Sequence, residues 1–127
     1  MKPFSFSRNE KLKSKAQIDR LFAEGRSITV YPLKLIFSEA TFDDKSTIKT
    51  AVSVSKRHHK KAVARNKIKR LLREAYRLNK PSDFNKTETG FALMILYLSK
   101  DQPSFELIHS KMTMLMAKFK ASIENKS

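Results

Sequence analysis

The sequence has no cysteine, no tryptophan and only two glycines among its 127 residues. Without cysteine the chain has no disulfide bonds, no thiol nucleophile and no cysteine-ligated zinc, and it fits a reducing compartment. Two isolated glycines, Gly25 and Gly90, cannot form the glycine-rich loops that hold phosphates in nucleotide-dependent enzymes. These absences argue against zinc, thiol and nucleotide-dependent enzymes.

Acidic residues and long apolar runs are also scarce. The chain has 12 Asp and Glu against 27 Lys and Arg, a net charge of +15, which predicts an anionic partner. The first twenty residues contain no apolar segment long enough for a signal peptide or a membrane span, so we expect a soluble, cytoplasmic protein. The apolar fraction of 40% is sufficient for one folded domain.

We expect the chain to have three parts. Residues 1–13 are polar and basic without a periodic pattern, which predicts a flexible N-terminal arm. Residues 14–122 form the single domain, and residues 123–127 form a C-terminal tail. No internal repeat or second domain is visible.

The first half of the domain predicts one helix and then strands. Ser14 and Gln17 have the spacing of a capping box, and Gly25 is placed to end that helix. Residues 28–42 are β-branched and aromatic, with the alternation of a half-buried strand. Residues 48–55 alternate most clearly. Their apolar face is Ile48, Thr50, Val52 and Val54, and their wettable face is Lys49, Ala51, Ser53 and Ser55.

The second half predicts a helix, a buried strand and a last helix. Apolar residues recur at helical spacing from about Lys61 to Asn79, and Pro81 follows. Residues 91–98 are a continuous apolar run, typical of a strand buried on both faces, and Ser104 can cap the last helix. The predicted order, α-β-β-β-α-β-α, is that of a single α+β domain with about four strands and with the helices against one sheet face.

Two thirds of the net charge lies between Lys56 and Lys80, where eleven Lys and Arg accompany a single acid, Glu74. On a helical wheel the predicted 61–79 helix is amphipathic, with apolar residues, including Leu78, opposite a cationic arc. That arc contains Arg65, Asn66, Lys69, Arg70, Arg73 and Arg77. Like charges four residues apart destabilise an isolated helix, so we expect an anionic partner to offset the repulsion.

The arginines favour phosphate as that partner, because guanidinium contacts phosphate oxygens bidentately. A membrane surface is the main alternative, but the opposite arc has no Trp or Phe for insertion. We therefore expect a nucleic acid. The arginines alone do not decide between DNA and RNA.

A more specific pattern lies in AVSVSKRHHKKAVARNKIKRLLREAYR, residues 51–77. A strand ending in Ser-Val-Ser-Lys leads through a short basic loop to Arg65-Asn66, followed by Lys69-Arg70 and Arg73-Glu74. This segment resembles the protein subunit of bacterial ribonuclease P, and weaker likeness covers nearly the whole chain. The sequence departs from the family pattern at Lys67, where an arginine is usual, and in the loop 57–61, which lacks the usual glycine and is one residue longer.

The resemblance implies a left-handed βαβ crossover, an exception to the right-handed rule. It also implies a large catalytic RNA as partner and precursor tRNA, whose 5′ leader is removed, as substrate. The protein itself would supply no catalytic residue and bind no cofactor, and Mg2+ would be held by the RNA; no DNA or membrane partner is expected. The residues expected to bind the catalytic RNA are Lys56, Arg57, Arg65, Asn66, Lys69, Arg70, Arg73 and Arg77.

The resemblance further implies that the leader lies in a cleft between the first helix and the open sheet face. Strand phasing gives that face independently, and it combines cations with apolar side chains, which suits sequence-tolerant binding of a single strand. The expected leader-binding residues are Ile18, Phe22, Lys34, Ile36, Lys49, Ser53 and Ser55. For Ile18 and Phe22 a place in the core is an equal alternative, because apolar residues four apart on a helix usually pack inward.

Other candidate sites have simpler interpretations. His58 and His59 lie in a cationic loop without a nearby carboxylate, so we expect phosphate contact or solvation there and no metal site. Asp43 and Asp44 are the only adjacent acids, too few to hold a catalytic magnesium ion. Two alternative functions follow: a ribosomal or chaperone-like RNA-binding module, and a protein-only nuclease that depends on Asp43 and Asp44.

Overall fold

The computed structural model describes residue 12 and residues 15–40, 48–79 and 90–124. Within these residues the element order agrees with the predicted one. The elements are α1 (Lys15–Glu24), β1 (Arg26–Val30), β2 (Leu33–Glu39), β3 (Ile48–Val54), α2 (Ala62–Asn79), β4 (Phe91–Tyr97) and α3 (Phe105–Glu124). The cap of the first helix at Ser14, the turn around Asp43 and Asp44, and Pro81 lie outside the described residues.

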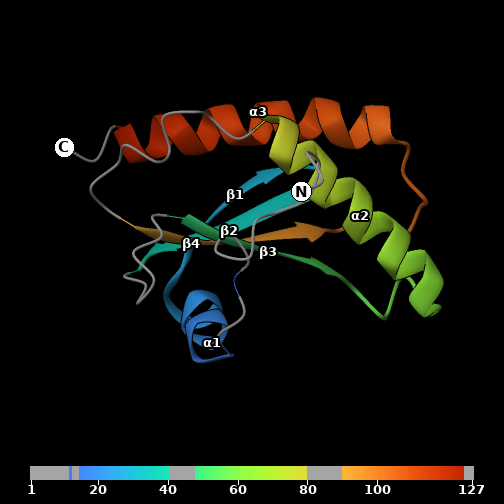
Figure 1. Cartoon of the computed structure of the whole chain (residues 1–127), viewed down its shortest axis with the longest axis horizontal. Coiled ribbons are helices and arrows are strands. Elements are labelled where there is room, and N and C mark those ends of the chain that lie inside the picture. The colour runs from blue at the N-terminus through green and yellow to red at the C-terminus, as the bar shows by residue number, and fades with distance from the viewer. Residues whose placement is uncertain (1–11, 13–14, 41–47, 80–89, 125–127) are drawn as a thin grey trace, which may run out of the picture.

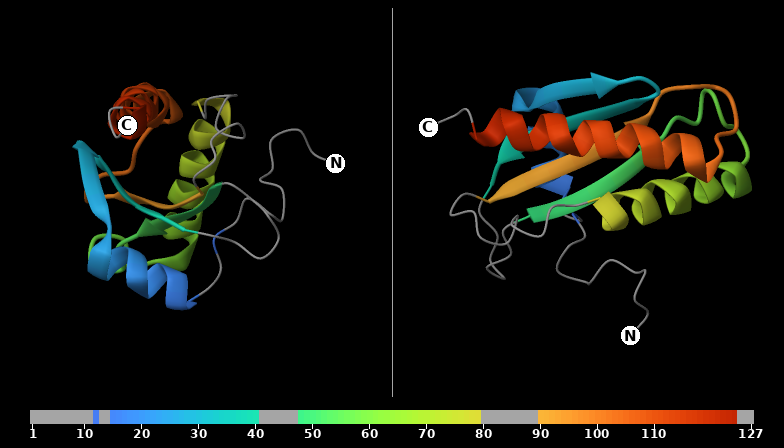
Figure 2. Two further views of the ribbon diagram at one scale, coloured as in Figure 1. Left: turned by 90° about the vertical axis from the view of Figure 1, so that its left-hand side faces the viewer. Right: turned by 90° about the horizontal axis from the view of Figure 1, so that it is seen from above.

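The four strands form one mixed sheet in the order β1-β2-β4-β3. The pairs β1/β2 and β2/β4 are antiparallel, and β3/β4 is parallel. Helix α2 therefore connects two neighbouring parallel strands. Seen from the side of α2 and α3, with the strands pointing upward, β4 lies to the left of β3 (Figure 2). The crossover is thus left-handed, as the resemblance implied.

Helices cover both faces of the sheet, so the prediction that all of them lie on one face is wrong. Helices α2 and α3 pack on one face, and α1 packs on the other (Figure 1). The physical reason is β4, which is buried at nearly every position. Because successive side chains of a strand point to opposite faces, an all-apolar central strand needs a cover on each side.

The main core lies between the sheet and the pair α2 and α3. From α2 it takes Ile68, Leu72, Ala75 and Tyr76, which are buried. An aromatic group holds α3 to the sheet: the ring of Phe119 packs edge-on against Phe37 and Phe91, at centroid distances of 5.0 and 5.7 Å. Leu78, which the helical wheel placed on the apolar arc, is exposed at the end of α2.

A smaller cluster lies under α1. It consists of Leu12, Leu21, Ala92 and Met94, with Ile18 and Ile36 packed against it. Leu12 belongs to the predicted flexible arm, yet its side chain is buried and its N–H donates to the carbonyl of Thr50 at 3.1 Å. The rest of that arm lies outside the described residues.

Local details depart from the sequence pattern in two places. A turn at Tyr31 and Pro32 divides residues 28–42 into the hairpin β1/β2. Helix α3 reaches Glu124, into the predicted tail, and the Leu107 N–H donates to Ser104 Oγ at 3.1 Å, so that Ser104 caps α3 as predicted. No helix in the described part of the chain is long and apolar enough to cross a membrane.

Candidate nucleic-acid interface

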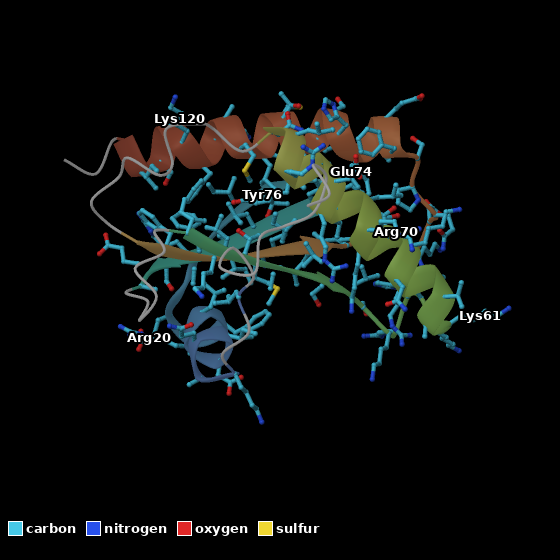
Figure 3. All side chains as sticks on the ribbon, in the orientation of Figure 1. Arg20, Lys61, Arg70, Glu74, Tyr76 and Lys120 are labelled. Carbon is cyan, nitrogen blue, oxygen red and sulfur yellow. The ribbon has the colours of Figure 1, made fainter. Side chains whose placement is uncertain are left out.

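The outer face of α2 is cationic, as the helical wheel predicts. Of the expected RNA-binding residues, five are exposed: Lys56, Arg57, Asn66, Arg70 and Arg73. Lys69 is half-buried. Figure 3 shows Lys61 beside the start of α2 and Arg70 farther along the same helix. We refer to Asn66, Arg70 and Arg73 as the outer face of α2, and to Lys56, Arg57, Lys60 and Lys61 as the loop cations.

Two of the expected RNA-binding arginines turn back onto the protein. Arg65 Nη1 donates to the carbonyl oxygens of His59 and Lys60, at 2.9 and 2.8 Å. The side chain of Arg77 is only 17% exposed, and its Nη2 lies 3.8 Å from Glu74 Oε1. Both arginines therefore interact with their own chain, so the exposed residues of this group are better placed to meet an RNA.

His59 lies in a different environment from the one that the sequence pattern predicts. Its side chain is 5% exposed, Nε2–H donates to the Ser99 carbonyl at 2.9 Å, and the ring packs 5.9 Å from that of Tyr97. The prediction of phosphate contact or solvation is wrong for His59, whereas His58 is exposed. The contact joins residues 40 positions apart, which no local pattern reveals.

The hydroxyl of Tyr97 continues this network by donating to the Asp101 carbonyl at 2.7 Å. Burial raises the pKa of Tyr97 above its ordinary value of 10.0, a hydrogen bond with Ser99 opposes that shift, and the nearby Asp101 adds to it. Tyr97 is consequently a neutral donor under ordinary conditions. Its position at the end of β4 fixes the loop that follows.

The sheet face under α1 carries most of the expected leader-binding residues. Lys34 and Ser53 lie in one lateral row, each opposite Leu96 of β4. Two strand spacings of about 4.8 Å separate them. Lys49 lies four residues from Ser53 on the same strand, a distance of about 13 Å at 3.3 Å per residue. Lys34, Lys49 and Ser53 are all half-buried.

Helix α1 contributes differently through its two predicted residues. Ile18 packs onto the small cluster with Ile36, so both belong to the contact between α1 and the sheet. Phe22 is 52% exposed, and its ring is available to a ligand. Ser55 is exposed, but its hydroxyl oxygen accepts the Arg57 N–H at 3.1 Å and its carbonyl accepts the His59 N–H at 3.0 Å. Ser55 thus shapes the loop.

Gly25 allows this close approach of α1 to the sheet. Its N–H donates to the Leu21 carbonyl at 2.8 Å, directly after the end of α1. A Cβ atom at this position would collide with that carbonyl oxygen and lie 2.7 Å from Ile36 Cγ2. Only glycine fits between the end of α1 and β2 without a displacement.

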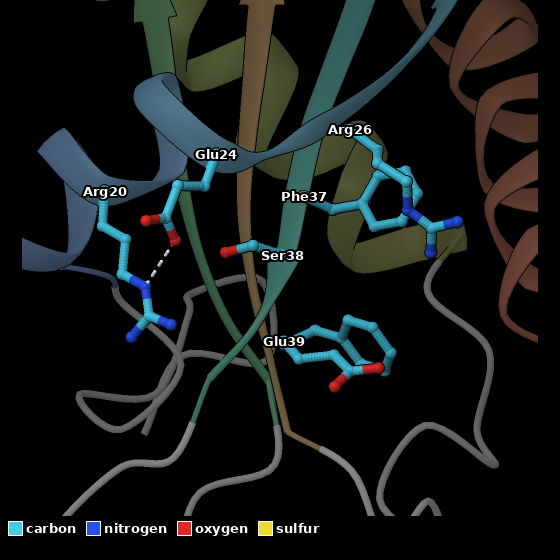
Figure 4. Close-up of a pocket in the computed structure, with 7 residues that line it drawn as sticks. Arg20, Glu24, Arg26, Phe37, Ser38 and Glu39 are labelled. Atoms are coloured by element: carbon cyan, nitrogen blue, oxygen red, sulfur yellow. Dashed lines mark hydrogen bonds and ion pairs between the residues drawn. The ribbon is translucent and has the colours of Figure 1, made fainter.

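A pocket of about 280 Å³ opens next to Gly25, where β1 begins and β2 ends (Figure 4). Arg20 Nε donates to Glu24 Oε2 at 2.9 Å across its rim, and the guanidinium of Arg26 lies 5.0 Å from the ring centre of Phe37. Its mixed charges, with Glu39 also in the wall, distinguish it from the cationic α2 surface. In the described part of the chain no three His, Asp or Glu residues are grouped as metal ligands.

Comparison with known proteins gives consistent results. A family model described as Ribonuclease P matches residues 6–120. The ribonuclease P protein component of Porphyromonas gingivalis is 33% identical over 112 residues, which cover 86% of this chain and 82% of that protein. The ribonuclease P protein component of Chlorobium phaeobacteroides is 33% identical in an alignment that spans 93% of this chain and 90% of that protein.

Solved structures share the fold. The RNase P protein of Staphylococcus aureus superposes with a TM-score of 0.67 at 19% identity, over 87% of this chain and 95% of that one. The RNase P protein of Thermotoga maritima gives a TM-score of 0.65 at 22% identity, over 85% and 96%. The two structures agree with this chain in the four-stranded mixed sheet and its three helices.

Proposed function

The chain belongs to the ribonuclease P protein family, the protein component of an endoribonuclease that processes the 5′ end of tRNA together with an RNA, and from this premise we propose where it binds. The outer face of α2 and the loop cations bind the catalytic RNA. The surface between α1 and the sheet binds the 5′ leader of precursor tRNA.

One observation carries this proposal: the two surfaces lie on opposite faces of one sheet. Arg70 and Arg73 project from α2 on one side, and Phe22 and Lys34 lie on the α1 side. One small protein can therefore contact two RNA segments at once. Arginine suits phosphate oxygens, and an exposed aromatic ring stacks on any base without reading sequence.

The chemistry of cleavage then belongs to the RNA. Mg2+ is held by the RNA, and the protein contributes affinity for the leader and screens phosphate repulsion. Precursor tRNA is the substrate, the site of action is the cytoplasm, and neither DNA nor a membrane is a partner.

Cleavage of a precursor tRNA with a 5′ leader, at low magnesium, tests the proposal. The three reactions contain bacterial catalytic RNA alone, this protein alone, and both together. We expect cleavage only in the mixture. Tight RNA binding without stimulation, even with RNA from the same source, would favour a ribosomal or chaperone-like module.

The same experiment tests the protein-only alternative. Cleavage by the protein alone with magnesium, abolished by Asp43→Asn and Asp44→Asn, would assign catalysis to the chain. We expect no cleavage in that reaction, and the double variant should stimulate the catalytic RNA as the unmodified protein does.

A further inference from the structure

The loops that follow β3 and β4 are in contact at the end of the sheet where these two parallel strands finish. The first loop, residues 55–61, carries the loop cations, and the second, residues 98–104, leads from β4 to α3. His59 joins them, because its buried ring donates from Nε2–H to the Ser99 carbonyl. Two hydrogen bonds stabilise the second loop. The Asp101 N–H donates to Ser99 Oγ at 3.0 Å, and the Asp101 carbonyl accepts the Tyr97 hydroxyl.

Arg65 holds the same loop through the backbone of that loop. It lies one turn into α2, and its Nη1 bridges the carbonyl oxygens of His59 and Lys60. Each of these bonds has a charged donor, which makes it stronger than a neutral one. The loop is therefore fixed at His59 by its side chain and at His59 and Lys60 by their backbone.

The loop needs such fixation because of its charge. Lys56, Arg57, Lys60 and Lys61 are four cations within six residues, and all four are exposed. Their mutual repulsion and their side-chain entropy both favour a spread of conformations. A loop already held in its bound form loses less entropy when a polyanion binds.

We propose that His59 and Arg65 are positioning residues for the catalytic RNA, which hold the loop cations in one arrangement and act on affinity through them. This inference rests on the proposed function. It assigns Arg65 a role different from that of Arg70 and Arg73, although all three share the cationic arc. It also assigns a role to His59, whose buried ring has no direct access to an RNA.

Substitution of His59 tests the idea because it removes no phosphate contact of its own. We would compare His59→Leu, His59→Gln and the exposed neighbour His58→Leu at one fixed pH. Affinity for the catalytic RNA is measured across a series of salt concentrations, and thermal melting is recorded for each protein. Leucine keeps the packing against Tyr97 and loses the donor, whereas glutamine can restore an N–H toward Ser99.

We expect His59→Leu to weaken binding about tenfold and to flatten the salt dependence. Each lost phosphate contact lowers the slope by about 0.7 to 0.9, and the release of two loop cations should lower it by about 1.5. His59→Gln should recover most of the slope, and His58→Leu should retain all of it. A lower melting temperature with an unchanged slope would overturn the proposal and leave His59 a purely structural residue.

Arg65 provides a second test that does not depend on the His59 variants. Arg65→Met and Arg73→Met each remove one cation from the same helix. If Arg65 and Arg73 each only contact a phosphate, the two variants should lower the slope of the salt dependence equally. If Arg65 positions the loop cations, Arg65→Met should lower that slope by the equivalent of at least one more phosphate contact than Arg73→Met does. Equal losses would overturn the proposal. A wild-type slope near zero would instead contradict the proposed function itself, so the two failures are distinguishable.

Discussion

The two faces of the sheet are built for different purposes. Behind β2 and β4, toward α2 and α3, lies an extensive apolar core that includes the rings of Phe37, Phe91 and Phe119. Toward α1 the same strands present a small cluster around Leu21 and Met94, with half-buried lysines at its margins. Burial stabilises in proportion to apolar area, so most of the folding free energy comes from the first face. Side chains on the second face can therefore serve binding with little loss of stability.

The largest expected effect comes from a substitution in the core between the sheet and the helices α2 and α3. Phe119→Ala removes a fully buried ring that contacts two other rings, and we expect the free energy of unfolding to fall by about 3–5 kcal/mol. Urea denaturation measures this loss. A loss below about 1 kcal/mol would mean that α3 contributes little to the core.

The next effect concerns the seam between α1 and the sheet. Gly25→Ala introduces a Cβ against the Leu21 carbonyl and Ile36, and we expect a loss of about 1–3 kcal/mol from the displacement of α1. Denaturation measures the stability, and binding of leader-bearing tRNA should weaken as well. The exposed Ser27→Ala on β1 serves as a control, with little change in either measurement.

On the sheet face toward α1 we expect a substitution to change binding and to leave stability unchanged. Phe22→Ala should weaken binding of leader-bearing precursor by about 1–3 kcal/mol if the ring stacks on a base. Its exposed side chain predicts a change in unfolding free energy within about 0.5 kcal/mol. Mature tRNA, which lacks the leader, is the control substrate; an equal loss for it would contradict a leader site at α1.

The smallest effect depends on pH and lies at the end of β4. Because burial raises the pKa of Tyr97 in the folded state, the folded protein retains this proton after the unfolded chain has lost it. Stability from this group is therefore complete below pH 10.0 and falls as the pH rises through the folded pKa. Tyr97→Phe should cost about 1 kcal/mol near pH 7 through the lost hydrogen bond and reduce the alkaline loss.

Denaturation at pH 7 and at several values above pH 10 measures both effects for Tyr97. Tyr31→Phe provides a graded comparison, because Tyr31 makes the smallest contribution to the raised pKa of Tyr97, so its removal should lessen the alkaline loss only slightly. If Tyr97→Phe lost as much stability above pH 10 as the unmodified protein, burial of the Tyr97 hydroxyl would not be the cause of that loss.

The sequence predicted best those elements whose apolar pattern shows which face is buried. Helix α2 and strand β3 have strong periods over many residues, so their bounds and buried faces were predictable within one or two positions. Strand β4 was predictable as a doubly buried strand, but a continuous apolar run does not say which element covers each side. For that reason the placement of α1 was missed. The predicted order contained three strands before α2, but the turn between β1 and β2 at Tyr31 and Pro32 was not located, because it contains neither glycine nor asparagine.

The candidate site shows a similar division. Exposure of Arg70 and Arg73 followed from the helical wheel, and the resemblance supplied the hand of the crossover. The hydrogen bonds of His59 and Arg65 did not follow, because each depends on carbonyl oxygens whose positions only the folded loops define. A charged or polar side chain in a basic segment carries no local sign that its partner is a backbone atom.

The strand order has a consequence for folding during synthesis on the ribosome. β4 lies between β2 and β3, yet it is the last strand to leave the ribosome, and Leu33 must wait for Tyr97 to become its partner. Until then the inner edges of β2 and β3 are unpaired, and such edges are sites of aggregation. Contacts so distant in sequence also close slowly. The β1/β2 hairpin can form early, but β3 joins it in one sheet only when β4 inserts between β2 and β3.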